Sequence, residues 1–236
     1  MTAVIAFAVL LMGGLAGATG LPEPSGALYP RFHDQAGELT LSWMETGEEG
    51  SSLHFVRRLG DAWSQPEVAA RGRRWLVNWA DVAQVAILPS GRWVAQWLVE
   101  DPREPYAYGI RLAQSTDGGG TWSDPVTPHR DGTATEHGFV SLLPAPGDAV
   151  RLFWLDGRAY AGAGGGHGAG EGATALRTAR LGADGAVDEE LELDGRVCDC
   201  CPTDAVRVGE DVVVAYRDRS VDEIRDIAVV RRHSGL

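Results

Sequence analysis

The sequence contains no lysine: all 21 basic residues are arginines, set against 33 aspartates and glutamates, for a formal net charge of −12. A surface this acidic repels nucleic-acid phosphates and anionic lipid head groups, so neither is an expected partner. Helical periodicity is weak, which argues against an α/β fold. The glycine-rich stretch at 161–172 is not followed by G-K-[ST]. It is therefore expected to be a flexible insertion and not a phosphate-binding loop.

The first twenty residues are apolar and end in small residues, with Ala16-Gly17-Ala18 fitting a signal-peptidase site. This apolar run is short for a spanning helix, and no later segment is apolar enough to cross a membrane. We therefore predict that residues 1–20 are a signal peptide and that the protein is secreted or periplasmic. The alternative is a buried N-terminal segment.

Tryptophan and glycine are frequent instead, with 8 and 31 residues, as expected for short strands, tight turns and large flat side chains between layers. Four segments have the pattern strand, turn, strand, aromatic: 27–43, 82–97, 139–154 and 205–216. Their closing aromatics are 54, 57 and 62 residues apart, and they are Trp43, Trp97, Trp154 and Tyr216. The chain is therefore built from an internally repeated unit.

The second unit adds a distinctive octapeptide, S-T-D-G-G-G-T-W at 115–122, which matches S-x-D-x-G-x-T-W. Ser115 and Asp117 can hydrogen-bond the backbone of a tight turn, and Gly119 can take a positive φ. Thr121 completes the pattern, and Trp122 is expected to fold back under the turn. Only decayed versions remain in the other units.

Repeats of this length with about four short strands each are what a β-propeller requires. A blade depends on its neighbours to bury its faces. The fold prediction is an all-β propeller over 25–236, with blades at about 27–72, 81–131, 137–195 and 203–236.

The octapeptide resembles the Asp-box, or BNR repeat, of the sialidase (neuraminidase) superfamily. The phrases WLVNWAD at 75–81, TEHG at 135–138 and YRDR at 216–219 are similar to those of bacterial exo-sialidase-like proteins. The resemblance implies six blades, of which three and a half to four are present, so the ring is expected to be incomplete. Open blade edges would then permit self-association. A degenerate four-bladed ring is the alternative.

Residues just before the inner strands are candidates for a site at one end of the central channel. Asp81, Glu136 (followed by His137) and Asp204 hold such positions and predict a ring of carboxylates. The alternative is that these side chains only cap strands and bond loop amides.

The resemblance implies a role for several of these residues. Asp81 corresponds to the acid and Asp204 to the family's glutamate base, while Glu136 is the third candidate carboxylate. Arginines clamp the sugar carboxylate, and the candidates are Arg31, Arg217, Arg219 and Arg225. In the family, another arginine and the nucleophilic tyrosine come from later blades. The charge run at 217–226 could instead be a surface ion-pair loop.

Three cysteines stand within four residues, at Cys198, Cys200 and Cys201. They could hold a soft metal, or form one disulfide with a thiol left over, and a redox role is also open. We favour a packed, partly oxidised turn between blades.

The resemblance implies a sialidase-like, retaining exo-glycosidase acting on terminal acidic sugars, inactive if the chain is truncated, with carbohydrate as partner and no cofactor. The alternatives are a non-catalytic propeller that binds a glycan or a protein, and a metal-handling exported protein that uses the cysteine turn.

Overall fold

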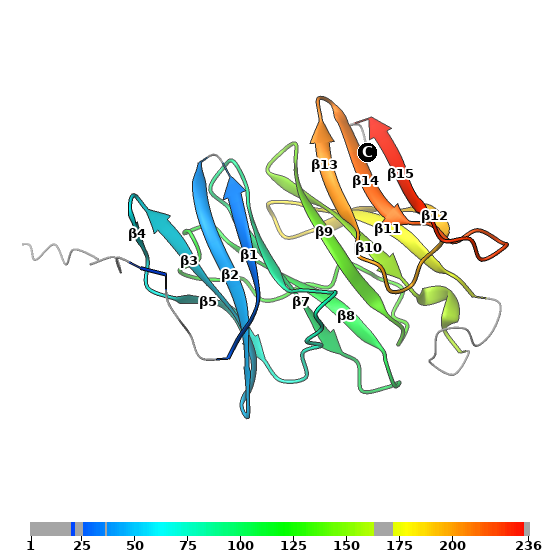
Figure 1. Cartoon of the computed structure of the whole chain (residues 1–236), viewed down its shortest axis with the longest axis horizontal. Coiled ribbons are helices and arrows are strands. Elements are labelled where there is room, and N and C mark those ends of the chain that lie inside the picture. Colours follow the sequence, from blue (N-terminus) through cyan, green and yellow to red (C-terminus); the bar gives the residue numbers. More distant parts are fainter. Residues whose placement is uncertain (1–19, 22–25, 36, 163–171, 234–236) are drawn as a thin grey trace, which may run out of the picture.

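The computed structural model describes residues 20–21, 26–35, 37–162 and 172–233. These residues form four antiparallel sheets and one short 3₁₀ helix, η1 (Arg158–Tyr160), so the all-β prediction is confirmed. Figure 1 shows the sheets following one another in chain order, from the blue N-terminal sheet to the red C-terminal one. The expected signal peptide at 1–20, apart from its last residue, and most of the glycine-rich stretch lie outside the described residues.

The first sheet is a meander in which each strand pairs with the one before it, except that β5 joins on β3. Its strands are β1 (Ala27–Gln35), β2 (Glu38–Gly47), β3 (Gly50–Leu59), β4 (Ala62–Trp63) and β5 (Glu67–Gly72). Consecutive residues are buried in the middle of β2 (Ser42–Met44) and of β3 (Phe55–Val56), so both faces of these strands are covered there.

The other three sheets repeat the same up-and-down order. The second contains β6 (Gln84–Ile87), β7 (Trp93–Glu100) and β8 (Tyr108–Ser115). The third contains β9 (His137–Ala145), β10 (Ala149–Asp156), β11 (Thr174–Leu181) and β12 (Val187–Val197). The fourth contains β13 (Asp204–Val208), β14 (Asp211–Arg217) and β15 (Ile227–His233).

Consecutive sheets pack face to face through separate apolar clusters. Phe55 and Met44 of the first sheet meet Trp93 and Trp97 of the second. Further clusters join the second sheet to the third and the third to the fourth. Each sheet therefore buries at least one face against a chain neighbour, which is the dependence that the repeat predicts, while Val206, Val208 and Val229 of the fourth sheet stay exposed.

The four closing aromatics occupy the second strand of each sheet and are all buried. Trp97, Trp154 and Tyr216 belong to the clusters between consecutive sheets. Trp43 packs with Val56 and Trp63 on the opposite face of the first sheet from Met44. The spacing seen in the sequence thus marks equivalent packing positions.

The octapeptide at 115–122 folds as its residue types predict. The Ser115 hydroxyl accepts the Gly119 amide at 2.8 Å, and the Asp117 carboxylate accepts both the amide and the hydroxyl of Thr121, at 2.9 and 2.7 Å. Gly119 has a φ of 93°, and the Trp122 indole donates back to its carbonyl at 3.0 Å. These bonds hold the pKa of Asp117 at about 2, well below its usual value.

No helix among the described residues has the length and apolar character needed to cross a bilayer.

Candidate active site

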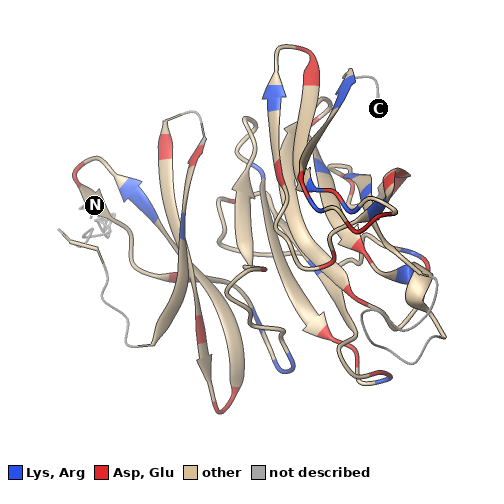
Figure 2. Cartoon of the chain, turned by 45° about the vertical axis from the view of Figure 1, so that its right-hand side comes forward, with Lys and Arg blue, Asp and Glu red and all other residues tan. Residues whose placement is uncertain are grey.

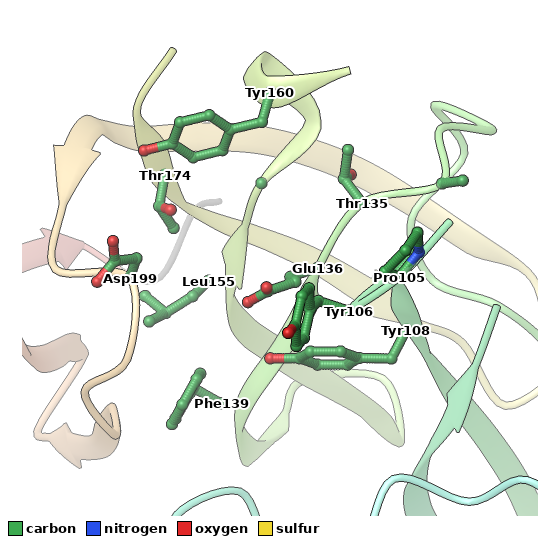
Figure 3. Close-up of a pocket in the computed structure, with 13 residues that line it drawn as sticks. Pro105, Tyr106, Tyr108, Thr135, Glu136, Phe139, Leu155, Tyr160, Thr174 and Asp199 are labelled. Atoms are coloured by element: carbon green, nitrogen blue, oxygen red, sulfur yellow. The ribbon is translucent and has the colours of Figure 1, made fainter. Parts of the chain in front are cut away.

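A cleft of about 530 Å³ opens where the loops before β8 and β9 meet the turn after β12. A narrower cavity shares part of its wall and extends toward Tyr160. Figure 3 shows Glu136, Tyr106 and Tyr108 together on one side, with Asp199 and Tyr160 on the other. The residues lining both hollows are Pro105, Tyr106, Ala107, Tyr108, Glu136, Phe139 and Asp199.

Asp81 lies in the loop before β6, with 4% of its surface exposed. Its Oδ2 accepts the backbone amide of Phe139 at 2.6 Å, and the Val140 amide also bonds it. Burial raises the pKa of Asp81 to about 7, although these bonds and the charge of Arg31 act in the opposite direction. The Asp81 carboxyl is therefore close to half protonated at neutral pH.

A β-bulge in the third sheet explains how two successive amides reach one carboxylate. The pairing of β9 with β10 shifts between Phe153 and Leu155, so that β9 carries an extra residue. At this point Phe139 adopts a φ of 55°, which is strained for a non-glycine residue. Bulges re-aim backbone groups next to functional sites, and this one directs its donors at Asp81.

Gly138 permits the close approach of Asp81 and Tyr108. A Cβ atom at this position would lie 2.1 Å from Asp81 Oδ2 and 2.7 Å from the Tyr108 ring. Burial raises the pKa of the Tyr108 hydroxyl, and the charges of Asp81 and Glu136 raise it further. Tyr108 is therefore a neutral hydrogen-bond donor in the cleft and not a phenolate.

Glu136 stands directly before β9 and is half-buried in the cleft wall. Its backbone bridges to Tyr108, and its carbonyl accepts the Gly157 amide at 2.8 Å. Asp81 and Glu136 thus both border the Tyr108 ring, as the two expected carboxylates at matched positions.

Asp204 occupies a different position from the one expected of it. It is exposed at the start of β13, where its Oδ1 accepts the Ala205 amide at 2.9 Å, and it does not line the cleft. Asp199, five residues earlier, lines the cleft instead. Of the expected ring, Glu136 lines the cleft and Asp81 lies buried behind Tyr108 and Phe139, while Asp199 stands in the cleft wall where Asp204 was expected.

The four candidate arginines separate into two groups. Arg31 is exposed on β1, close enough to lower the pKa of Asp81. Arg219 and Arg225 both bond Glu223, whose pKa falls to about 2 mainly through Arg219. Arg217 donates to the Arg225 carbonyl at 3.1 Å.

Arg219 also reaches the Tyr160 hydroxyl at 3.4 Å, and Arg225 lies 3.7 Å from Asp199. Basic and acidic segments lie side by side in the loop before β15 (Figure 2). The charge run at 217–226 is therefore a surface ion-pair network, the alternative stated for it above, and it contacts the cleft wall through Tyr160 and Asp199.

A second polar cluster behind Glu136 was not foreseen from the sequence. His137 is fully buried, with Nε2 3.2 Å from Asp131 Oδ1 and 3.7 Å from Asp156 Oδ2. His129 stacks on His137 with ring centroids 3.8 Å apart, and Arg158 bonds Asp156 at 2.7 Å. The sequence feature that could have revealed this cluster is the spacing H-x-D-x₅-H at 129–137. It differs from the helical H-x-x-x-H spacing usually sought for metal ligands.

His129, Asp131 and His137 place three ligand atoms within 4.8 Å of one another. Two imidazoles with an interplanar angle of 9° cannot both direct in-plane lone pairs at one ion between them. Arg158, 3.5 Å from Asp131, already supplies positive charge. The cluster is therefore a charge network that anchors the start of β9.

Cys198 and Cys201 are joined in a disulfide, and Cys200 is an exposed free thiol on the cleft wall. The structure thus contains one disulfide and one remaining thiol, which is one of the arrangements predicted from the sequence. The three-thiol metal site is not formed in this state because two of its sulfurs are bonded to each other.

Comparisons with known proteins place this fold. A scan against protein-family models and a search of curated proteins found no match. Among solved structures, a protein of unknown function from Dyadobacter fermentans aligns with a TM-score of 0.57 at 17% identity, over 85% of this chain and 51% of that one. The chain thus spans about half the length of that protein.

Two glycoside hydrolases are similar as well. A thermostable family-43 enzyme aligns with a TM-score of 0.53 at 10% identity, over 89% of this chain and 70% of that one. A family-43 β-xylosidase/α-arabinofuranosidase from a compost microbial metagenome, in complex with xylotriose, aligns with a TM-score of 0.50 at 12% identity. The alignment covers 93% of this chain and 78% of that one. The fold is that of β-propeller glycoside hydrolases. These two are not sialidases, so that resemblance rests on sequence motifs.

Proposed function

We propose that the chain is a glycosidase-like propeller that receives a terminal sugar in the cleft, with Asp81 as the proton donor. The observation that carries this proposal is a carboxyl group buried directly behind the cleft-lining residues Tyr108 and Phe139, whose pKa is raised to about 7. A general acid works best when its pKa is near the working pH, and raised carboxyls of this kind protonate leaving oxygens. The neighbours of this fold include enzymes that act on glycosides.

Glu136 is the second carboxylate of the proposed reaction. Glycoside hydrolysis generally requires a pair of carboxyl groups, one to donate a proton and one to act as base or nucleophile. Glu136 borders the Tyr108 ring on the side facing the cleft (Figure 3). It is half-buried, whereas Asp81 is 4% exposed. We therefore assign the role of proton donor to Asp81 and that of base or nucleophile to Glu136.

The substrate we propose is an acidic sugar of the sialic-acid type. Arg31 is exposed on β1 and its charge acts on Asp81, so we assign it to the substrate carboxylate, whereas Arg219 and Arg225 are held by Glu223. Tyr106 adds an aromatic face at the cleft rim, where 78% of its surface is exposed. The neighbouring enzymes act on xylosides and arabinosides, so neutral sugars are the comparison class.

A non-catalytic glycan-binding propeller is the second candidate. It is favoured by Tyr108, whose raised pKa makes it a hydrogen-bond donor and not a nucleophile. It is also favoured by Arg219 and Arg225, which already pair with Glu223 and Asp199.

Hydrolysis of aryl sialoside, aryl arabinofuranoside and aryl xyloside, each against a heat-treated control, tests both candidates. We expect turnover of the sialoside, reduced about 10²- to 10⁴-fold by Asp81→Asn with sugar binding retained. Turnover of only the neutral glycosides would refute the acidic-sugar proposal. Glycan binding that survives Asp81→Asn, with no turnover of any substrate, would establish the second candidate.

We also propose export from the cytoplasm. It is supported by the apolar N-terminal residues and by the Cys198–Cys201 disulfide, because disulfides persist mainly in oxidising compartments. N-terminal sequencing of the protein recovered from the producing cell tests it, with a mature terminus after Ala18 as the expected result. A retained Met1 would refute it.

A further inference from the structure

Three sulfur atoms gather in the turn between β12 and β13, at the cleft wall. Cys198 and Cys201 form the disulfide, and the Cys200 sulfur lies 3.9 Å from that of Cys198. Each sulfur of the disulfide has a guanidinium beside it: Arg217 Nη1 is 3.7 Å from Cys201, and Arg225 Nη1 is 3.9 Å from Cys198.

A neutral disulfide gains little from a nearby guanidinium, but a thiolate gains considerably. Positive charge next to a cysteine favours the thiolate, which is both the leaving group and the product of disulfide reduction. Arg225 is shared with Asp199 and Glu223. Among the described residues, Arg217 has no carboxylate within ion-pairing distance, so its charge is directed mainly at Cys201.

Accessibility distinguishes the two bonded sulfurs. Cys198 is 1% exposed, whereas Cys201 is half-buried and more open to solvent. Burial, and after it the charge of Asp199, raises the pKa of the exposed Cys200 thiol. These effects make Cys200 a weaker acid than an ordinary cysteine, although Arg225 and Arg217 act in the opposite direction.

We propose that Cys198 and Cys201 are a redox-active pair that exchanges with a low-molecular-weight dithiol at the cleft mouth. A thiolate of the dithiol bonds to Cys201 as the Cys201–Cys198 bond breaks, and Cys198 leaves as a thiolate beside Arg225. The second thiol of the dithiol loses its proton and attacks the first, which releases Cys201 as a thiolate beside Arg217. Two electrons pass to the protein, and the dithiol becomes a cyclic disulfide.

The redox state of the pair would be coupled to the structure of the cleft that the cysteine turn borders. Asp199 lies between its two cysteines and lines both hollows, and the Cys198 amide is anchored on the Arg217 carbonyl at 2.8 Å. This role is independent of any action on sugars, so it stands or fails separately from the proposed function.

The test uses the full chain in dithiothreitol buffers with defined ratios of reduced to oxidised reagent, followed by iodoacetamide and mass spectrometry. We expect reversible reduction and reoxidation of the pair, in the native protein and in Cys200→Ser. In the reduced protein, half-buried Cys201 should be alkylated faster at pH 7.5 than exposed Cys200. A pair that cannot be reduced while the protein stays folded by circular dichroism, or slower alkylation of Cys201, would overturn the proposal.

Substitution of Arg217 separates charge from structure. Arg217→Gln should slow alkylation of Cys201 about tenfold, as expected when one charge is removed within 4 to 6 Å of a thiolate. Arg217→Lys keeps the charge and should retain most of the rate. Arg58→Gln, which removes an exposed arginine of the first sheet, is the matched control and should leave the rate unchanged. Equal rates in all three variants would refute the role of Arg217.

Discussion

Replacing Asp81 by asparagine should stabilise the protein at neutral pH and flatten its pH dependence. The folded carboxyl holds its proton up to a pKa of about 7, whereas the unfolded chain releases it near 3.8. Between these values the folded state binds more protons, so stability falls as pH rises. The group costs roughly 2 kcal/mol at pH 5 and roughly 4 kcal/mol at pH 7, an increase of roughly 2 kcal/mol across that range.

Asparagine keeps an oxygen to accept the Phe139 amide but carries no charge to desolvate. Urea unfolding followed by tryptophan fluorescence at pH 5 and pH 7 measures the effect. All other titrating groups are common to both proteins, so the difference between the two pH-dependent changes isolates Asp81. Asp204→Asn removes an exposed carboxyl and is the control. If Asp81→Asn altered the change from pH 5 to pH 7 by less than about 0.5 kcal/mol, burial of the carboxyl would not be the cause of its raised pKa.

Three further substitutions test the packing and the site. Gly138→Ala places a methyl group against Asp81 and Tyr108, so it should lower stability by about 1–3 kcal/mol and abolish turnover, whereas Gly47→Ala, which meets no atom within 4 Å, should do neither. Gly119→Ala should cost about 2–4 kcal/mol in thermal unfolding, because its Cβ would lie 2.4 Å from Phe55 at a positive φ, and Gly91→Ala, with a similar φ and open space, should cost less. Glu136→Gln should reduce turnover at least 10²-fold with sugar affinity nearly unchanged, and a wild-type rate would exclude it from the reaction.

The repeat made the fold predictable because its signals are local. Trp43, Trp97, Trp154 and Tyr216 recur at one position of a hairpin, and each fills that position in the structure. The octapeptide at 115–122 was equally predictable, since its side chains bond their own turn. The number of blades in a complete ring stays a prediction, because it depends on packing beyond these local patterns.

The site was predictable only in part. Asp81 and Glu136 followed from their positions before inner strands, and the structure brings both to the Tyr108 ring. The bulge at Phe139 left no signal in a sequence of ordinary strand residues, although it provides the amides that hold Asp81. Asp204 is exposed at the start of β13, whereas Asp199, in the disulfide-closed turn before it, lines the cleft, and sequence spacing alone did not distinguish the two.

The groups that hold Asp81 belong to the neighbouring sheet, and this has a mechanical consequence. The carboxyl sits at the head of the second sheet, while the amides of Phe139 and Val140 belong to the third. Any relative displacement of the two sheets would lengthen these bonds and weaken the acid. The pKa of Asp81 therefore depends on how the second and third sheets are aligned. A ligand that moves the two sheets apart, or holds them together, would change this pKa without contacting the carboxyl.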